Sequence, residues 1–210
     1  MKTVFMFSGQ GAQYAGMGKD LYKNYPVAKE IFDRADNVLG YSIKDICFED
    51  EQKLGETEFA QPAILTMSIA AMKVLEEEGV RADMTAGLSL GEYSAYVASE
   101  AMDFEEAVAL VQKRGKFMAE AVPSGEGAMY AIIGLDTALV EEACAEATAE
   151  GDGLAVQANY NAPGQIVIAG HAQAAKRAAA LAKEKGAKLT VPLKVSGPFH
   201  TELLLSLIHI

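Results

Sequence analysis

The feature that most restricts how this chain can fold is the pentapeptide at residues 87–91, which matches G-x-S-x-G. That pattern places a serine on a sharp turn between a β-strand and an α-helix, with its oxygen exposed at the start of the helix. The neighbouring sequence predicts a short strand at 84–86 and a helix from about 92 to 99. Glycines at both ends keep side chains out of the crowded turn. By itself the pattern leaves an ordinary glycine-rich turn open.

Apolar periodicity around this unit predicts an α/β core. The run 4–7 ends at a glycine-rich loop, which is typical of a buried strand in a parallel sheet. Helical spacing over 26–39 stops at Gly40. We expect Pro62 to open a buried helix that ends at Gly79, and a further helix over 104–121. Strands that alternate with helices favour this fold class.

After a Pro-Ser-Gly linker at 123–125, the chain predicts a smaller α+β unit. The predicted strands are 128–133, 154–160, 165–169 and 187–193, and the predicted helices are 136–149 and 171–185. This β-α-β-β-α-β order is the ferredoxin-like pattern. We therefore predict a hydrolase-like parallel-sheet core from residues 1–125 plus 193–210, with an inserted ferredoxin-like subdomain at 126–192.

Composition excludes several function classes. A formal net charge of −11 repels nucleic acid, and the short basic clusters are solvated helix faces or a docking patch for an acidic partner. Those clusters contain Lys113, Arg114, Lys116, Lys176, Arg177, Lys183, Lys185 and Lys188. Two distant cysteines, Cys47 and Cys144, predict neither a disulfide framework nor a metal site. No secretory leader or membrane span is expected, so we predict a cytoplasmic protein.

A reactive Ser89 needs a base, and the chain has three histidines. His171 stands at the start of a predicted helix, where a capping or surface role is favoured, and His209 is next to the last residue. His200 is the best candidate by elimination, although a structural role stays open. Between Ser89 and His200 no acid occupies a recognisable triad position.

Two further features indicate how an acyl group would be held. The glycine-rich segment 8–13 lets backbone N–H groups approach a ligand, and it lacks the pattern of a phosphate-binding loop. Arg114 lies among apolar helix neighbours, where a half-buried guanidinium requires an anion, ideally a carboxylate. The alternative for Arg114 is a salt bridge to Glu105, Glu106 or another acid.

Taken together, these segments resemble malonyl-CoA:acyl carrier protein transacylases over residues 1 to about 204. The six matching segments, in chain order, are 7–13 (FSGQGAQ), 61–63 (QPA), 87–94 (GLSLGEYS), 114–118 (RGKFM), 161–165 (NAPGQ) and 195–200 (VSGPFH). Leu88 stands where many members of the family have histidine.

The resemblance implies a role for each matching residue. Ser89 is the acylated nucleophile and His200 its base, and the backbone N–H groups of Gln10 and Leu90 form the oxyanion hole. The remaining implied residues bind substrate: Arg114 clamps the malonyl carboxylate, Gln61 lines the same pocket, and Asn161 lies near the coenzyme A side.

The implied reaction belongs to fatty acid biosynthesis and is ping-pong. Malonyl-CoA acylates the serine, and the phosphopantetheine thiol of acyl carrier protein then takes the malonyl group. Malonyl-CoA is a substrate, so no cofactor and no metal are expected, and we expect a monomer. Because the carrier is acidic, like this chain, docking must use a local basic patch near the cleft mouth.

Members of the family continue well beyond residue 204 with further core elements, and there they supply the carbonyl that orients the histidine. Residues 205–210 do not resemble that continuation, so we expect a truncated reading frame with a non-native tail. Three alternatives remain open. They are a polyketide-synthase-type acyltransferase, an α/β-hydrolase-like thioesterase or esterase, and an inactive fragment.

Overall fold

A computed structural model describes residues 2–123, 125–193, 195 and 197–209. Ser124 of the predicted linker, Ser196 of the histidine segment and Ile210 of the predicted tail lie outside the described residues, as do Met1 and Lys194. The chain divides into two compact units, Met1–Lys116 and Phe117–Ile210, each with its own buried core. The predicted boundaries at 125, 126 and 192 stay a prediction.

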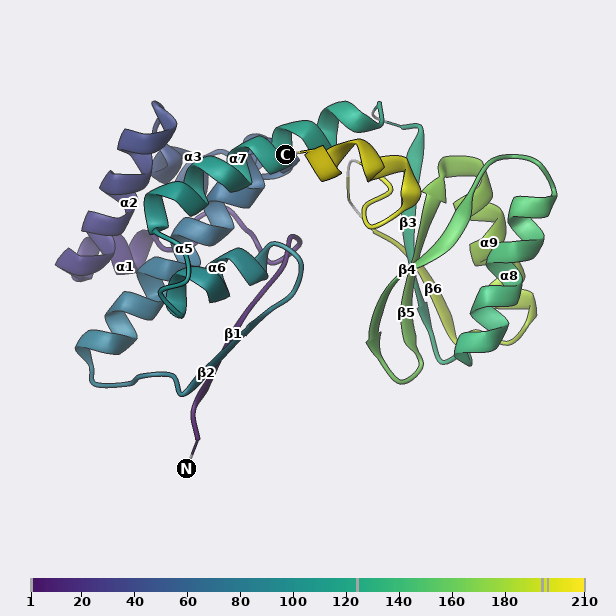
Figure 1. The fold of residues 1–210 in the computed structure, drawn as a ribbon, viewed down its shortest axis with the longest axis horizontal. Coiled ribbons are helices and arrows are strands. Elements are labelled where there is room, and N and C mark those ends of the chain that lie inside the picture. Colours follow the sequence, from purple (N-terminus) through teal and green to yellow (C-terminus); the bar gives the residue numbers. More distant parts are fainter. Residues whose placement is uncertain (1, 124, 194, 196, 210) are drawn as a thin grey trace. The chain divides into compact units, whose positions relative to one another are not determined.

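The first unit is a helical layer against a small parallel sheet (Figure 1). Its elements in chain order are β1 (Val4–Phe7), α1 (Lys19–Asn24), α2 (Pro26–Leu39), α3 (Ile43–Glu49), α4 (Glu51–Leu54), α5 (Thr57–Glu77), β2 (Met84–Gly87), α6 (Gly91–Ala98) and α7 (Phe104–Ala121), whose last turn belongs to the second unit.

The parallel pairing of the first two strands is confirmed, because Val4 to Phe7 align with Met84 to Gly87 in parallel register. The predicted burial of the first strand is wrong for most of its length. Only Phe7 is buried, whereas Met6 is 82% exposed. In the described chain this sheet has two strands, so the outer edge of β1 has no neighbouring strand to cover it.

The long helix α5 corrects one predicted boundary. Pro62 does not open the helix but lies inside it, five residues after the first residue, Thr57. A proline at this position lacks the N–H that would bond to the carbonyl of Glu58, and the packing of the buried helix offsets that loss. The expected burial is confirmed, since α5 packs against α2, α3 and α6 and most of its apolar residues are inaccessible.

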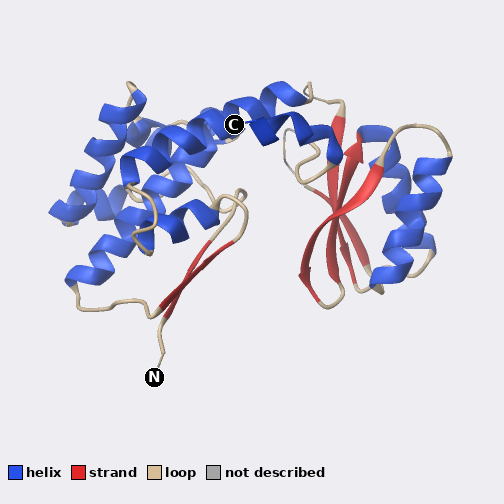
Figure 2. Ribbon diagram, in the orientation of Figure 1, coloured by secondary structure: helices blue, strands red, loops and turns tan. Residues whose placement is uncertain are grey.

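The second unit contains β3 (Gly127–Ile133), α8 (Thr137–Ala149), β4 (Ala155–Ala162), β5 (Gln165–His171), α9 (Ala172–Glu184), β6 (Leu189–Pro192) and the 3-10 helix η1 (Glu202–His209). Its antiparallel sheet has the strand order β4-β5-β3-β6. Helices α8 and α9 lie side by side and contact the sheet (Figure 2). Every strand and helix predicted between 128 and 193 is present, with ends shifted by a few residues.

An α/β fold is therefore confirmed. Among the described residues no helix is long and apolar enough to cross a membrane.

Candidate active site

Ser89 lies on the turn between β2 and α6, as the G-x-S-x-G pattern predicts. Its backbone φ is +53°, in the left-handed region that few non-glycine residues adopt. The turn is closed by two hydrogen bonds, from the Gly91 N–H to the Leu88 carbonyl (2.9 Å) and from the Glu92 N–H to the Ser89 carbonyl (3.2 Å). This geometry presents the serine side chain outward at the first turn of the helix.

The two glycines of the turn are required by backbone contacts. A Cβ atom on Gly87 would lie 2.1 Å from the carbonyl carbon of Gly91. A Cβ atom on Gly91 would lie 2.2 Å from the carbonyl oxygen of Phe7 at the end of β1. Any larger residue would push α6 away from both strands, so the pattern is a structural necessity here and not a chance glycine-rich turn.

Arg114 connects three elements at the serine. From α7 its Nη1 donates to Gln61 Oε1 on α5 (2.6 Å) and its Nη2 donates to Ser89 Oγ (3.1 Å). The ring of Tyr93, one turn after Ser89 on α6, has its centroid 5.6 Å from the guanidinium carbon. Gln61 is completely buried. The predicted substrate-binding pair and the predicted nucleophile are therefore brought together.

The electrostatics of Arg114 are those of a cation in need of an anion. Burial lowers the pKa of Arg114, and this is opposed more weakly by the nearby Tyr93 and Glu92. Across the described ranges Arg114 forms no ion pair. Glu105, one of the two acids weighed as its partner, instead pairs with Arg34 at 2.7 Å. A guanidinium held only by neutral oxygens and a ring has spare capacity for a carboxylate.

The two predicted oxyanion residues lie on adjacent loops of the first unit. Leu90 directly precedes α6 and its side chain is 1% exposed. Gln10 follows β1, and its Nε2 donates to Thr57 Oγ1 (3.2 Å) at the start of α5. A Cβ atom on Gly9 would lie 2.8 Å from the Leu88 carbonyl oxygen, so the 8–13 loop contacts the serine turn directly.

His200 and Asn161 belong to the second unit. His200 is exposed with a φ of +61°, beside the buried Phe199, and Thr201 Oγ1 donates to the Pro198 carbonyl (2.8 Å). Asn161 is exposed near the end of β4. His171 stands at the N-cap position of α9 but forms no side-chain cap hydrogen bond, and its Nδ1 instead accepts the Leu154 N–H at 2.9 Å.

Sequence reasoning missed Tyr93, Thr57 and Gln13. Tyr93 carried a usable signal, because it lies in the first turn of the helix that follows Ser89. Thr57 carried none, because it lies in the part of α5 that was not predicted, and Gln13 carried none, because it contacts Leu54 on α4, which was not predicted.

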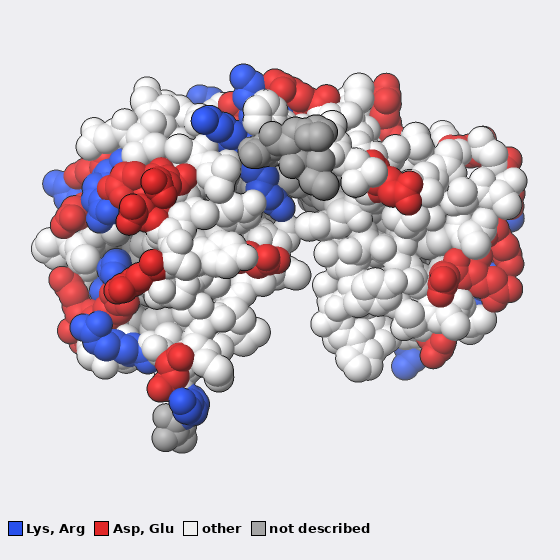
Figure 3. All heavy atoms as spheres, in the orientation of Figure 1, with Lys and Arg blue, Asp and Glu red and all other residues white. Residues whose placement is uncertain are grey.

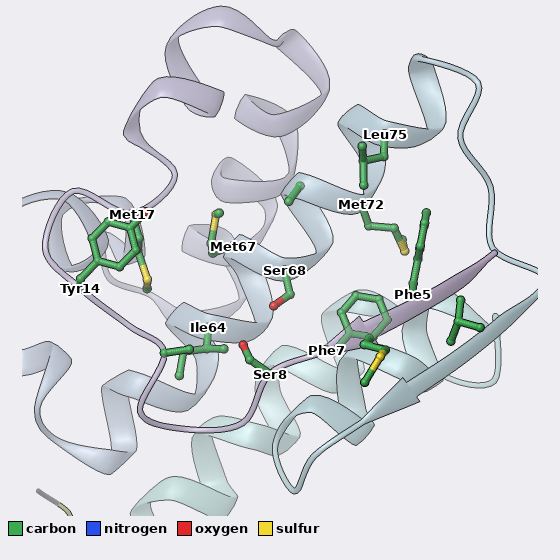
Figure 4. Close-up of a pocket in the computed structure, with 14 residues that line it drawn as sticks. Phe5, Phe7, Ser8, Tyr14, Met17, Ile64, Met67, Ser68, Met72 and Leu75 are labelled. Carbon is green, nitrogen blue, oxygen red and sulfur yellow. The ribbon is translucent and has the colours of Figure 1, made fainter.

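A cavity of about 390 Å³ lies between β1 and α5 and is separate from the Ser89–Arg114 pair (Figure 4). Its lining is mainly apolar, and Ser8, which follows β1, and Ser68 on α5 are drawn close to each other. Among the described residues no group of three or more His, Cys, Asp or Glu could hold a metal ion.

Comparison with known proteins identifies the family. The family described as "Acyl transferase domain" matches residues 4–201. A malonyl CoA-acyl carrier protein transacylase of Bacillus subtilis is 52% identical over 204 residues, which is 97% of this chain. The chain spans 64% of the length of that relative.

Two solved structures are also similar. MCAT from Streptococcus pneumoniae is 55% identical with a TM-score of 0.89, covering 97% of this chain and 66% of that one. A type II PKS acyl-carrier protein in complex with its malonyl-transacylase gives 43% identity and a TM-score of 0.92, with the same coverage. With the strand–serine–helix turn and the match over residues 4–201, the chain belongs to the acyl transferase domain family.

Proposed function

We propose that this protein transfers a malonyl group from malonyl-CoA to the phosphopantetheine thiol of acyl carrier protein. The observation that carries the proposal is the Arg114 guanidinium, which donates to the oxygen of Ser89 and forms no ion pair within the described residues. A diacid acyl group brings a carboxylate that would be costly to bury unpaired. A cation beside the nucleophile offsets that cost.

In the proposed first half-reaction, Ser89 Oγ attacks the thioester carbonyl carbon and His200 accepts the hydroxyl proton. The oxyanion that develops is held by the backbone N–H groups of Gln10 and Leu90. The carbon–sulfur bond then breaks, and the coenzyme A thiolate leaves with the proton from His200. Ser89 is left as a malonyl ester, with its free carboxylate on Arg114.

In the second half-reaction the carrier thiol gives its proton to His200 and attacks the ester carbonyl. The Ser89 oxygen leaves and regains a proton from His200, which restores the enzyme. Gln61 orients Arg114 through its 2.6 Å hydrogen bond, and Asn161 is assigned to the coenzyme A side by resemblance alone. The proposal needs no cofactor or metal.

The finer architecture is part of the same proposal. A hydrolase-like core from residues 1–125 plus 193–210 is supported by the parallel β1–β2 pair and the serine turn. A ferredoxin-like subdomain at 126–192 is supported by its element order and by the strand order β4-β5-β3-β6. A monomeric, cytoplasmic protein is the expectation that accompanies them.

Arg114 also weighs against a hydrolase-like esterase or thioesterase, because neutral acyl groups give a buried guanidinium nothing to bind. A polyketide-synthase-type acyltransferase is not favoured either, because the similar curated relatives are named malonyl CoA-acyl carrier protein transacylases and the similar structure with a polyketide carrier protein pairs it with a malonyl-transacylase.

The first test is intact mass after mixing the chain with malonyl-CoA or acetyl-CoA, beside a Ser89→Ala variant. We expect one malonyl adduct on the parent, little acetyl adduct, and none on the variant. A chain that is folded by circular dichroism but acquires no adduct would contradict the proposal for this chain. An adduct that persists in the variant would overturn the assignment of the nucleophile.

A further inference from the structure

Gln13 uses both ends of its side-chain amide to fix the loop that follows β1. Its Oε1 accepts the backbone N–H of Gly11 at 2.8 Å, and its Nε2 donates to the carbonyl oxygen of Leu54 at 3.1 Å. Leu54 is the buried last residue of α4. Gly11 has a φ of +111°, which a non-glycine residue would adopt only under strain. Glycine adopts this φ readily but many others as well, so the Gln13 amide selects one conformation of an otherwise adaptable loop.

These contacts surround Gln10. The Gly11 N–H belongs to the peptide that follows Gln10, and Gln13 holds it. The peptide that precedes Gln10 begins at Gly9, which packs against the Leu88 carbonyl of the serine turn. The side chain of Gln10 is itself held by Thr57 at 3.2 Å. Both peptide planes next to Gln10 are thus constrained, one by the serine turn and the other by Gln13, which is itself anchored to Leu54 outside the loop.

We propose that Gln13 is a positioning residue that aims the backbone N–H of Gln10 at the oxyanion. This inference rests on the proposed function, in which that N–H stabilises the tetrahedral intermediate. A donor works best when it is held in place before charge develops, so a loosened loop lowers the rate of acylation without weakening donor binding. Gln13 touches neither substrate nor nucleophile and acts only through the loop.

The role predicts a signature different from that of Arg114. An oxyanion forms on the carbonyl of every acyl donor, so loss of Gln13 lowers acylation by malonyl-CoA and acetyl-CoA by the same factor. Loss of the carboxylate clamp lowers only the malonyl reaction. A tether that merely stabilised the loop would reduce thermal stability and leave the acylation rate of the folded protein unchanged.

The test compares Gln13→Ala and Gln13→Glu with the parent. The control is Gln52→Ala, which removes an exposed glutamine from α4, the helix that carries Leu54. We expect a drop of about tenfold or more in the single-turnover acylation rate of Gln13→Ala, less than the loss of a whole oxyanion donor, equal for both acyl donors and with unchanged half-saturation. Gln13→Glu keeps the acceptor for the Gly11 N–H but loses the donor to the Leu54 carbonyl. Its acylation rate should therefore fall between those of the parent and Gln13→Ala.

Amide hydrogen exchange at Gly11, measured by NMR, gives a second readout that does not depend on turnover. Exchange should accelerate in Gln13→Ala and stay at the parent rate in Gln52→Ala. Parent-like acylation of Gln13→Ala, or an unprotected Gly11 amide in the parent, would overturn the inference. If the parent forms no adduct while its Gly11 amide is protected by Gln13, the proposed function fails and the loop constraint stands.

Discussion

At the scale of single residues, the site is built around Arg114, whose hydrogen-bond and ring partners among the described residues are neutral. Gln61 and Ser89 accept from Arg114, and Tyr93 covers one side of the guanidinium. Hydrogen bonds from a charged donor to a carboxylate are stronger than those to neutral oxygens. In the proposed reaction a diacid donor therefore replaces Ser89 as the partner of Arg114, which frees the hydroxyl at the moment when it has to react.

Removing this cation should convert a selective site into a poorly selective one. For Arg114→Ala we expect the specificity constant for malonyl-CoA to fall about 100-fold, which corresponds to one buried charged pair. Acetyl-CoA should change by less than about threefold, since the acetyl group carries no charge for Arg114 to bind. Single-turnover acylation with each donor measures both values. Arg34→Ala, which removes an arginine paired with Glu105, should leave both unchanged; equal losses for the two donors would contradict the clamp.

At the scale of elements, close approach between helices α5 and α7 sets the position of Arg114. Gly115 lies inside α7, and a Cβ atom there would stand 2.6 Å from the Thr57 carbonyl oxygen. Replacing glycine by alanine in a helix favours the helix by about 1 kcal/mol. Overpacking against backbone costs about 1–3 kcal/mol. We expect this cost to exceed the gain in helix propensity.

We therefore expect Gly115→Ala to lower the free energy of unfolding by about 1 kcal/mol and also to reduce malonyl selectivity, because Arg114 is its neighbour. Urea denaturation followed by circular dichroism measures the first effect. Ala119→Gly, at an exposed position of the same helix, isolates the helix-propensity contribution. A Gly115→Ala protein that is more stable than the parent would show that α7 can shift without cost.

The pair between Arg34 on α2 and Glu105 on α7 predicts a small dependence of stability on pH. A bidentate hydrogen bond from Arg34 lowers the pKa of Glu105. A carboxyl whose folded pKa is lowered contributes stability above its unfolded pKa, near 4.3, and loses it as pH falls through the folded value.

Both side chains are more than one-third exposed, so the contribution is at most about 1 kcal/mol. Glu105→Gln should lower the free energy of unfolding by that amount at neutral pH and by almost nothing well below pH 4. Urea titrations at the two pH values test this. A difference that grows as the solution is acidified would have the wrong sign.

At the scale of the whole molecule, acidic side chains outnumber basic ones, and on the face drawn in Figure 3 both kinds lie in groups separated by uncharged surface. Several cations of the predicted basic clusters are already paired. Arg177 contacts Glu150 at 2.9 Å, and Lys185 contacts Glu142 at 3.2 Å and Glu146 at 2.8 Å. Exposed Lys113, next to Arg114, forms no ion pair across the described ranges, so it is the better candidate for attracting an acidic carrier.

Lys113→Glu should lower the specificity constant for carrier protein several-fold at low salt, with a smaller effect at high salt because ions screen the attraction. Lys185→Glu, a charge reversal at a cation that already has two carboxylates, is the matched control and should change transfer less. Steady-state transfer at two ionic strengths measures both. Equal effects of the two variants would point to net charge in place of a local docking patch.

The serine turn, the long helices and the α/β class were predictable because each depends on local spacing. Glycines around Ser89 and the apolar period of 104–121 are such signals. The start of α5 was not predictable, because Pro62 is tolerated inside a helix that packing stabilises. That error also hid Thr57 and so the anchor of Gln10. The partner of Arg114 could not be chosen from sequence. Glu105 lies near Arg114 along the chain, but in the structure it pairs with Arg34.

The exposed first strand has a chemical consequence. Met6 is 82% exposed, whereas Met17 and Met72, which line the cavity beside it, are each 3% exposed. Mild peroxide should therefore convert the Met6 thioether to the sulfoxide well before the other two. The product places a polar group on an otherwise apolar strand, and any molecule that covers β1 would slow its formation. The rate of Met6 oxidation, followed by peptide mass mapping, therefore reports whether β1 is accessible to water.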